Sequence, residues 1–102
     1  MKRLIALTAL AAAAGFAHAA TPDEILTKSG CTACHQVAKK VVGPAYKDVA
    51  TKYKGQAVAA KLAEKVRKGG AGVYGPIPMP PHDDKKISDA DLKTVIDYIL
   101  KL

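Results

Sequence analysis

The chain has 102 residues, which is enough for one domain and too few for two. Its 16 Lys and Arg residues outnumber nine Asp and Glu, and the formal net charge of +7 favours acidic protein partners or anionic membranes. Because the lysines are interleaved with acidic residues and no nucleic-acid-binding motif is present, we expect no nucleic-acid partner.

The first 19 residues have the pattern of a secretory signal peptide. Basic residues at positions 2 and 3 precede an apolar run over residues 4–16, and Ala-His-Ala at 17–19 is a small-x-small cleavage site. The run is too short to cross a bilayer comfortably, so we expect cleavage after Ala19, to within one residue, and no membrane anchor afterwards. These features predict a periplasmic protein with one domain over residues 20–102.

The mature chain begins with a predicted helix. Thr21-Pro22-Asp23-Glu24 places a threonine at the N-cap, a proline at the first helical position and a glutamate three residues after the cap. The helix should run toward Ser29, and Gly30 is a suitable stop.

Cys31-Thr32-Ala33-Cys34-His35 follows, and C-x-x-C-H is the attachment signature of a c-type haem. On a helical turn, Cys31, Cys34 and His35 lie on one face and can meet one flat macrocycle. The two thiols would form thioethers with the haem vinyl groups, and the His35 imidazole would bind iron. Without its leader the chain has 83 residues and about +5 formal charge. A domain this small buries too little apolar surface to be very stable alone, so a haem would complete its core.

Three other readings of the cysteine pair are weaker. A four-coordinate zinc site needs more ligands than the chain offers nearby. A thioredoxin-type dithiol occurs in a βαβ setting, and this sequence shows no strand periodicity. A small structural disulfide would not require the histidine that follows Cys34.

Two further helices are predicted after a basic loop over residues 36–43, which ends in Gly43-Pro44. The first covers about residues 45–53 and is broken at Gly55. The second covers about residues 56–68, stops at a pair of glycines, and carries an apolar face four residues apart: Val58, Leu62 and Val66.

Residues 71–82 can form neither a helix nor a central strand, because four prolines remove backbone donors and fix φ. The last helix should start at Ser88, with Ile87 and Leu92 as a hydrophobic staple. Apolar residues then repeat at helical spacing to the end of the chain: Leu92, Val95, Ile96, Ile99 and Leu102.

If His35 binds iron, a second axial ligand can come from Met79 or His82. Met79 stands between Pro78 and Pro80, on a stiff segment that can hold a thioether in place. His82 is the competitor, but the polar run after it, residues 83–86, reads as an exposed turn. We therefore expect methionine ligation, with His82 behind the ligand or in solvent.

Taken together, three segments resemble the small bacterial class I cytochromes c of the c-551 type. They are Gly30–His35, Val42–Ala50 and Gly75–Pro81, in the same order and within a similarity that covers nearly all of the mature chain. The resemblance implies an all-α class I cytochrome c fold of four to five helices around one haem, with the first and last helices crossing. It also implies His35 and Met79 as axial pair, with the Pro44 carbonyl accepting a hydrogen bond from His35.

Three residues depart from the family pattern. The family usually has Trp at the positions of Tyr74 and Tyr98, and Asn at that of His82. By resemblance Tyr74 would lie against a haem propionate, although simple packing is an equal reading. For Tyr98 we expect core packing.

The expected function is that of a periplasmic electron carrier with one haem c, without catalytic residues and acting as a monomer. Its partners would be redox proteins with acidic docking surfaces. A cytochrome complex would be the donor, and a terminal oxidase, peroxidase or nitrogen-oxide reductase the acceptor. The alternative is a haem enzyme or gas-binding domain, which would need an open distal site.

Overall fold

Our computed structural model describes residues 20–102, which contain four α-helices and one 3-10 turn joined by loops. The elements are α1 (Pro22–Lys28), η1 (Cys31–Ala33), α2 (Tyr46–Lys52), α3 (Ala59–Lys68) and α4 (Asp89–Leu100). Within these residues the chain forms no strand, only two isolated bridges. The all-α prediction is confirmed; the predicted signal peptide lies outside the described residues.

Both predicted N-caps are present. The hydroxyl of Thr21 accepts a hydrogen bond from the Glu24 N–H at 3.3 Å, and that of Ser88 accepts one from the Asp91 N–H at 3.1 Å. Each satisfies one of the backbone donors that a helix start leaves open. Gly30, with φ of +82°, ends the turn after α1 and directs the chain into the cysteine motif.

Two predicted boundaries are wrong. Helix α3 begins at Ala59 instead of about Gln56, because the Gln56 N–H closes a turn onto the Tyr53 carbonyl at 2.9 Å. Helix α4 ends at Leu100, so Leu102 lies beyond it and is 39% exposed. Its N–H bonds to the Ile99 carbonyl, three residues back, which tightens the last turn and rotates Leu102 off the apolar face.

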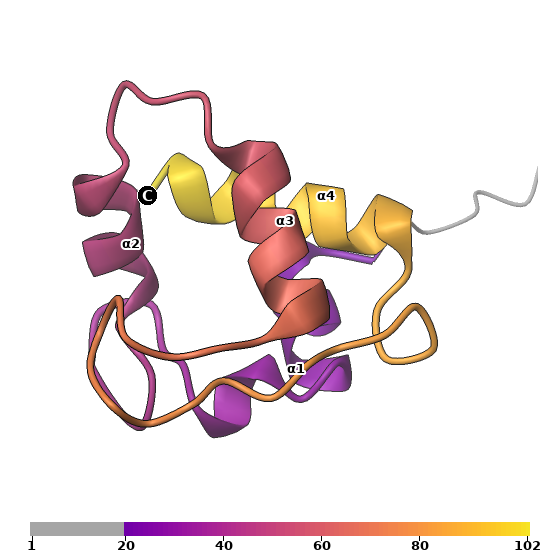
Figure 1. The fold of residues 1–102 in the computed structure, drawn as a ribbon. Helices are drawn as coiled ribbons and strands as arrows, with labels where there is room; N and C mark the ends of the chain where they lie inside the picture. Colours follow the sequence, from indigo (N-terminus) through magenta and orange to yellow (C-terminus); the bar gives the residue numbers. More distant parts are fainter. Residues whose placement is uncertain (1–19) are drawn as a thin grey trace, which may run out of the picture.

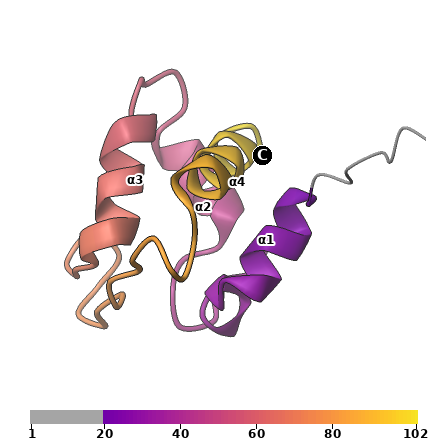
Figure 2. The same cartoon turned by 90° about the vertical axis from the view of Figure 1, so that its right-hand side faces the viewer.

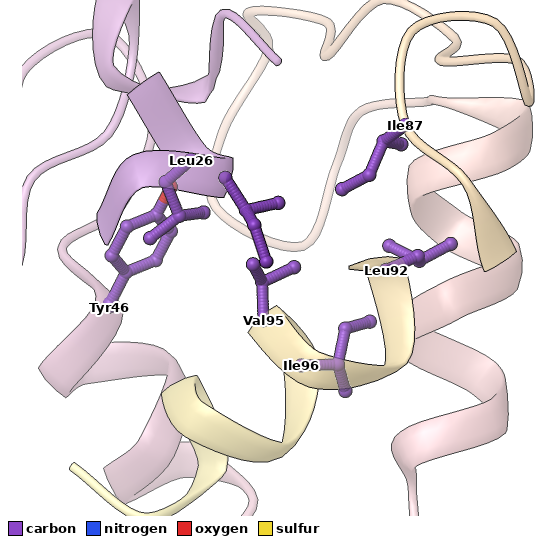
Figure 3. Packing of buried hydrophobic residues seen from close by; sticks show 7 residues of the cluster. Leu26, Tyr46, Ile87, Leu92, Val95 and Ile96 are labelled. Carbon is purple, nitrogen blue, oxygen red and sulfur yellow. The ribbon is translucent and has the colours of Figure 1, made fainter. Parts of the chain in front are cut away.

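Helix α4 is the centre of the packing, since it contacts α1, α2 and α3 (Figures 1 and 2). In Figure 2 α4 is seen nearly end-on, and α1 lies beside it in the plane of the picture. Ile87 and Leu92, the predicted staple, are both 3% exposed. The buried cluster consists of Ile25, Leu26, Tyr46, Ile87, Leu92, Val95 and Ile96 (Figure 3).

No helix in residues 20–102 is long and apolar enough to span a bilayer.

Candidate haem site

An apolar cavity of about 360 Å³ lies beside the buried cluster. Its wall is formed by α2, α3, α4, the cysteine motif and the loop over residues 70–79. The core residues Leu92, Val95 and Ile96 also line it, so the cavity is continuous with the hydrophobic core. Both the size and the apolar wall are typical of a site for a large ligand, for which cavities of ~300–1,000 Å³ are usual.

The cysteine motif lies at the edge of this cavity. The Cys34 and His35 N–H groups both donate to the Cys31 carbonyl, at 3.2 and 3.0 Å, and these bonds close the turn that gathers the three side chains. Cys31 and His35 line the large cavity, and all three line an adjoining cavity of about 90 Å³. Both thiols are free, and burial raises the pKa of Cys31.

The His35 ring is fixed by three neighbours. Its Nδ1 lies 2.9 Å from the Pro44 carbonyl oxygen, which only accepts, so in the neutral ring Nδ1 carries the proton and Nε2 keeps a lone pair. The Tyr46 ring stacks on it at 5.2 Å between centroids. On a third side Gly43 lies so close that an added Cβ would be 2.8 Å from Nδ1. This imidazole is therefore oriented as a metal ligand must be.

Met79 lies in the walls of the same two cavities as His35. We call residues 78–82, Pro-Met-Pro-Pro-His, the methionine strap. The Met79 N–H donates to the Gly70 carbonyl at 2.8 Å, and the Gly70 N–H donates back to the Met79 carbonyl at 3.0 Å. Proline on each side and these two bonds hold the thioether in place.

Comparison with known proteins agrees with this geometry. A family model described as cytochrome c matches residues 16–102. The chain belongs to the cytochrome c family. It is 58% identical to cytochrome c2 of Rubrivivax gelatinosus over 80% of this chain and 98% of that protein. It is 47% identical to cytochrome c-551 of Pseudomonas aeruginosa over 82% and 79%, respectively.

Among solved structures, the crystal structure of Nitrosomonas europaea cytochrome c552 superimposes with a TM-score of 0.72 at 49% identity. The match covers 78% of this chain and 98% of that one. The expected small class I cytochrome c fold is thus confirmed, and with it haem c as the cofactor. Individual ligand roles stay predictions.

The residues of this cytochrome c fit a haem. The cavity offers an apolar wall, an imidazole with a free Nε2, a thioether and two thiols at the margin. Among residues 20–102, no three His, Cys, Asp or Glu side chains lie close enough together to hold a bare metal ion.

His82 is not in solvent, which was one of its two predicted positions. It is 9% exposed and lines the smaller cavity only. Its N–H donates to the Val66 carbonyl at 2.9 Å, and its Nδ1 lies 2.8 Å from the Pro80 carbonyl. These bonds turn the ring inward, and the exposed turn begins one residue later, at Asp83.

The two tyrosines that depart from the family pattern differ in position. Tyr98 is partly buried against the core cluster, as expected for packing. Tyr74 is 39% exposed and lies in the cavity wall, where partial burial raises its pKa. The Lys52 ammonium lies 5.7 Å from its ring centroid, within cation–π range, and so connects α2 to the loop that carries Tyr74.

Three further residues of the wall, Lys61, Lys65 and Tyr46, bear on the chemistry of the site and were not predicted from the sequence. Lys61 and Lys65 bring positive charge to the cavity. They lie three and seven positions after Val58, on the helix face that also carries Leu62 and Val66, so helical periodicity could have predicted them. Tyr46 is 6% exposed, and its hydroxyl is buried without a hydrogen-bond partner. No local signal predicts such an orphaned group.

Proposed function

We propose that the protein is a periplasmic, monomeric electron carrier with one haem c attached through Cys31 and Cys34. In this proposal His35 and Met79 are the axial ligands. The observation that carries it is that an imidazole and a thioether, each fixed by backbone hydrogen bonds, line the same apolar cavity. The relatives named as cytochromes c agree with such a role.

The bound haem supplies a reversible one-electron couple between ferric and ferrous iron. The chain's own residues would set the reduction potential of that couple. His35, held by the Pro44 carbonyl, keeps Nε2 available, and the soft Met79 sulfur favours the ferrous state and raises the potential. With both axial positions filled there is no site for a substrate, so we infer a carrier and no enzyme.

Charge in the wall also has a role in this proposal. Haem propionates are carboxylates, and Lys61 and Lys65 are cations in the cavity wall. Tyr74, at the exposed margin, would donate a hydrogen bond to the same groups. The largely apolar remainder of the wall would keep water from the iron.

The experiment that tests the proposal is the far-red sulfur-to-iron charge-transfer band of the oxidised protein. We expect the band in the wild type and in His82→Ala alike. A wild type that lacks the band, together with a His82→Ala variant that gains it, would make His82 the ligand. A five-coordinate spectrum would instead favour the haem enzyme or gas-binding alternative.

Partner binding gives a further prediction. The exposed lysines include Lys39, Lys40, Lys47, Lys52, Lys54, Lys85 and Lys86. Of these, Lys40 forms an isolated bridge with His35 and so lies next to the attachment motif. We expect the bimolecular electron-transfer rate with an acidic partner to fall about tenfold as the Debye length shortens from ~30 to ~8 Å.

The matched pair for this prediction is Lys40→Gln and Lys93→Gln. Lys93 is exposed on α4 and already paired with Asp97 at 2.8 Å, so its loss removes the same formal charge at a different place. Stopped-flow rates at increasing salt should be lowered by Lys40→Gln and little changed by Lys93→Gln. A flat or rising salt profile would contradict a basic docking surface.

A further inference from the structure

The methionine strap forms no backbone–backbone hydrogen bond within itself. Three of its five residues are prolines, so residues 78–82 contain only two backbone N–H groups. The His82 N–H donates to the Val66 carbonyl in the last turn of α3, and the Met79 N–H donates to the Gly70 carbonyl, just past the C-cap of that helix. In Figure 1 the orange segment leaves the lower end of α3 and returns beneath that same end.

The backbone of the strap lies close to the backbone of Gly69. A Cβ built on Gly69 would overlap the Met79 carbonyl oxygen and lie 2.9 Å from the Pro81 nitrogen. The strap therefore rests directly on the turn that ends α3. Whatever holds these two segments together also holds Met79.

Arg67 is an α3 side chain that reaches over this junction. Its Nη1 donates to the Ile87 carbonyl at 2.7 Å and more weakly to the His82 carbonyl at 3.4 Å. Its Nη2 lies 2.5 Å from Asp89 Oδ1. One guanidinium thus connects the last residue of the strap, the residue before the N-cap of α4 and the first residue of α4.

The hydrogen bonds from Arg67 to the two carbonyls should stabilise this junction more than its ion pair with Asp89 does. The Arg67 side chain is 22% exposed, whereas that of Asp89 is 94% exposed, and such exposed pairs contribute little. Hydrogen bonds from a charged donor to partly buried carbonyls are stronger, and losing the donor leaves the carbonyls short of a partner.

We propose that Arg67 is a positioning residue, which keeps the methionine strap on the end of α3 and so limits the access of other ligands to the distal side of the haem. The second half rests on the proposed role of Met79. Arg67 does not line either cavity, and its hydrogen bonds within residues 20–102 go to the His82 and Ile87 carbonyls and to Asp89.

The test compares Arg67→Met with Lys68→Met in the haem-loaded protein. Both variants keep an apolar stem and remove one positive charge from the last turn of α3, so they alter the helix dipole interaction equally. Among residues 20–102, Lys68 is paired only with Glu64 on the same helix, and both side chains are more than half exposed. Asp89→Asn removes the ion pair and leaves the carbonyl bonds.

The first readout is hydrogen exchange at the Met79 and His82 amides, which does not depend on which residue binds iron. We expect Arg67→Met to raise both exchange rates about tenfold, equivalent to about 1.4 kcal/mol, with core amides of α4 much less affected. Lys68→Met and Asp89→Asn should change them less than twofold, and Arg67→Lys should restore part of the protection. Equal exchange in Arg67→Met and Lys68→Met would overturn the proposal.

The second readout is the affinity of the ferric protein for imidazole, which must displace the distal ligand. Arg67→Met should bind it about tenfold more tightly than wild type. If Arg67→Met showed faster exchange but unchanged imidazole affinity, Arg67 would still position the strap, but the proposal that it limits ligand access would be wrong. Failure of the Met79 assignment is distinguished by Met79→Ala, which would then bind imidazole no better than wild type.

Discussion

Replacing Met79 by Ala should leave the haem covalently attached, lower the reduction potential and open the sixth coordination position to water or carbon monoxide. The thioether stabilises ferrous iron, so its loss favours the ferric state. Axial ligands spread haem potentials over ~0.8 V, and we expect a decrease on the order of 0.1–0.3 V for this change. Voltammetry and carbon monoxide titration of the reduced protein measure the two effects.

Ile77→Ala is the matched control for Met79→Ala. Ile77 is also an apolar residue between two prolines on the same loop, it lines both cavities, and at 62% exposure its truncation removes little buried surface. We expect its potential to stay within a few tens of millivolts of wild type, a small part of that ~0.8 V span. A Met79→Ala protein with unchanged potential and unchanged carbon monoxide binding would contradict the assignment.

Those parts of the fold that depend on local chemistry could be predicted from the sequence. The Thr21 and Ser88 caps, the stop at Gly30 and the irregular segment of prolines all lie where their residue types require. The start of α3 could not be predicted, because the apolar period extends to Val58 and a turn that ends at Gln56 delays the helix. The apolar periodicity indicates which face of the helix is buried, but it does not indicate where the helical hydrogen bonds begin.

The candidate site likewise contains residues that local sequence predicts and residues that only tertiary contacts place. His35 and Met79 are marked by their neighbours in the chain, a C-x-x-C pair and two prolines. The burial of His82 depends on the Val66 carbonyl, 16 positions earlier, and the contacts of Arg67 reach 15 to 22 positions along the chain. Such contacts exist only after α3 and the strap have met, so no local pattern predicts them.

Gly43 gives the sharpest test of the proximal side, because its backbone has no need of glycine. Its φ lies outside the left-handed region, so by conformation alone Gly43→Ala should be neutral or stabilise the protein by ~0.4–1 kcal/mol. The surroundings of Gly43 predict destabilisation instead, because the new Cβ would overlap the His35 ring on its Cε1 and Nδ1 side. Either the ring or the Gly43-Pro44 backbone must move, and both movements disturb the bond between Nδ1 and the Pro44 carbonyl.

We therefore expect Gly43→Ala to lower the free energy of unfolding of the haem protein by about 2–3 kcal/mol, the cost of overpacking a tight site. It should also shift the reduction potential, because the orientation of His35 changes. Gly55→Ala is the control: its φ of +77° makes alanine unfavourable by ~1–2 kcal/mol, but nothing lies within 4 Å of the new Cβ. That variant should lose stability without any change in potential. Guanidinium unfolding and voltammetry measure both quantities, and a Gly43→Ala protein as stable as wild type with an unaltered potential would show that Gly43 does not hold the imidazole.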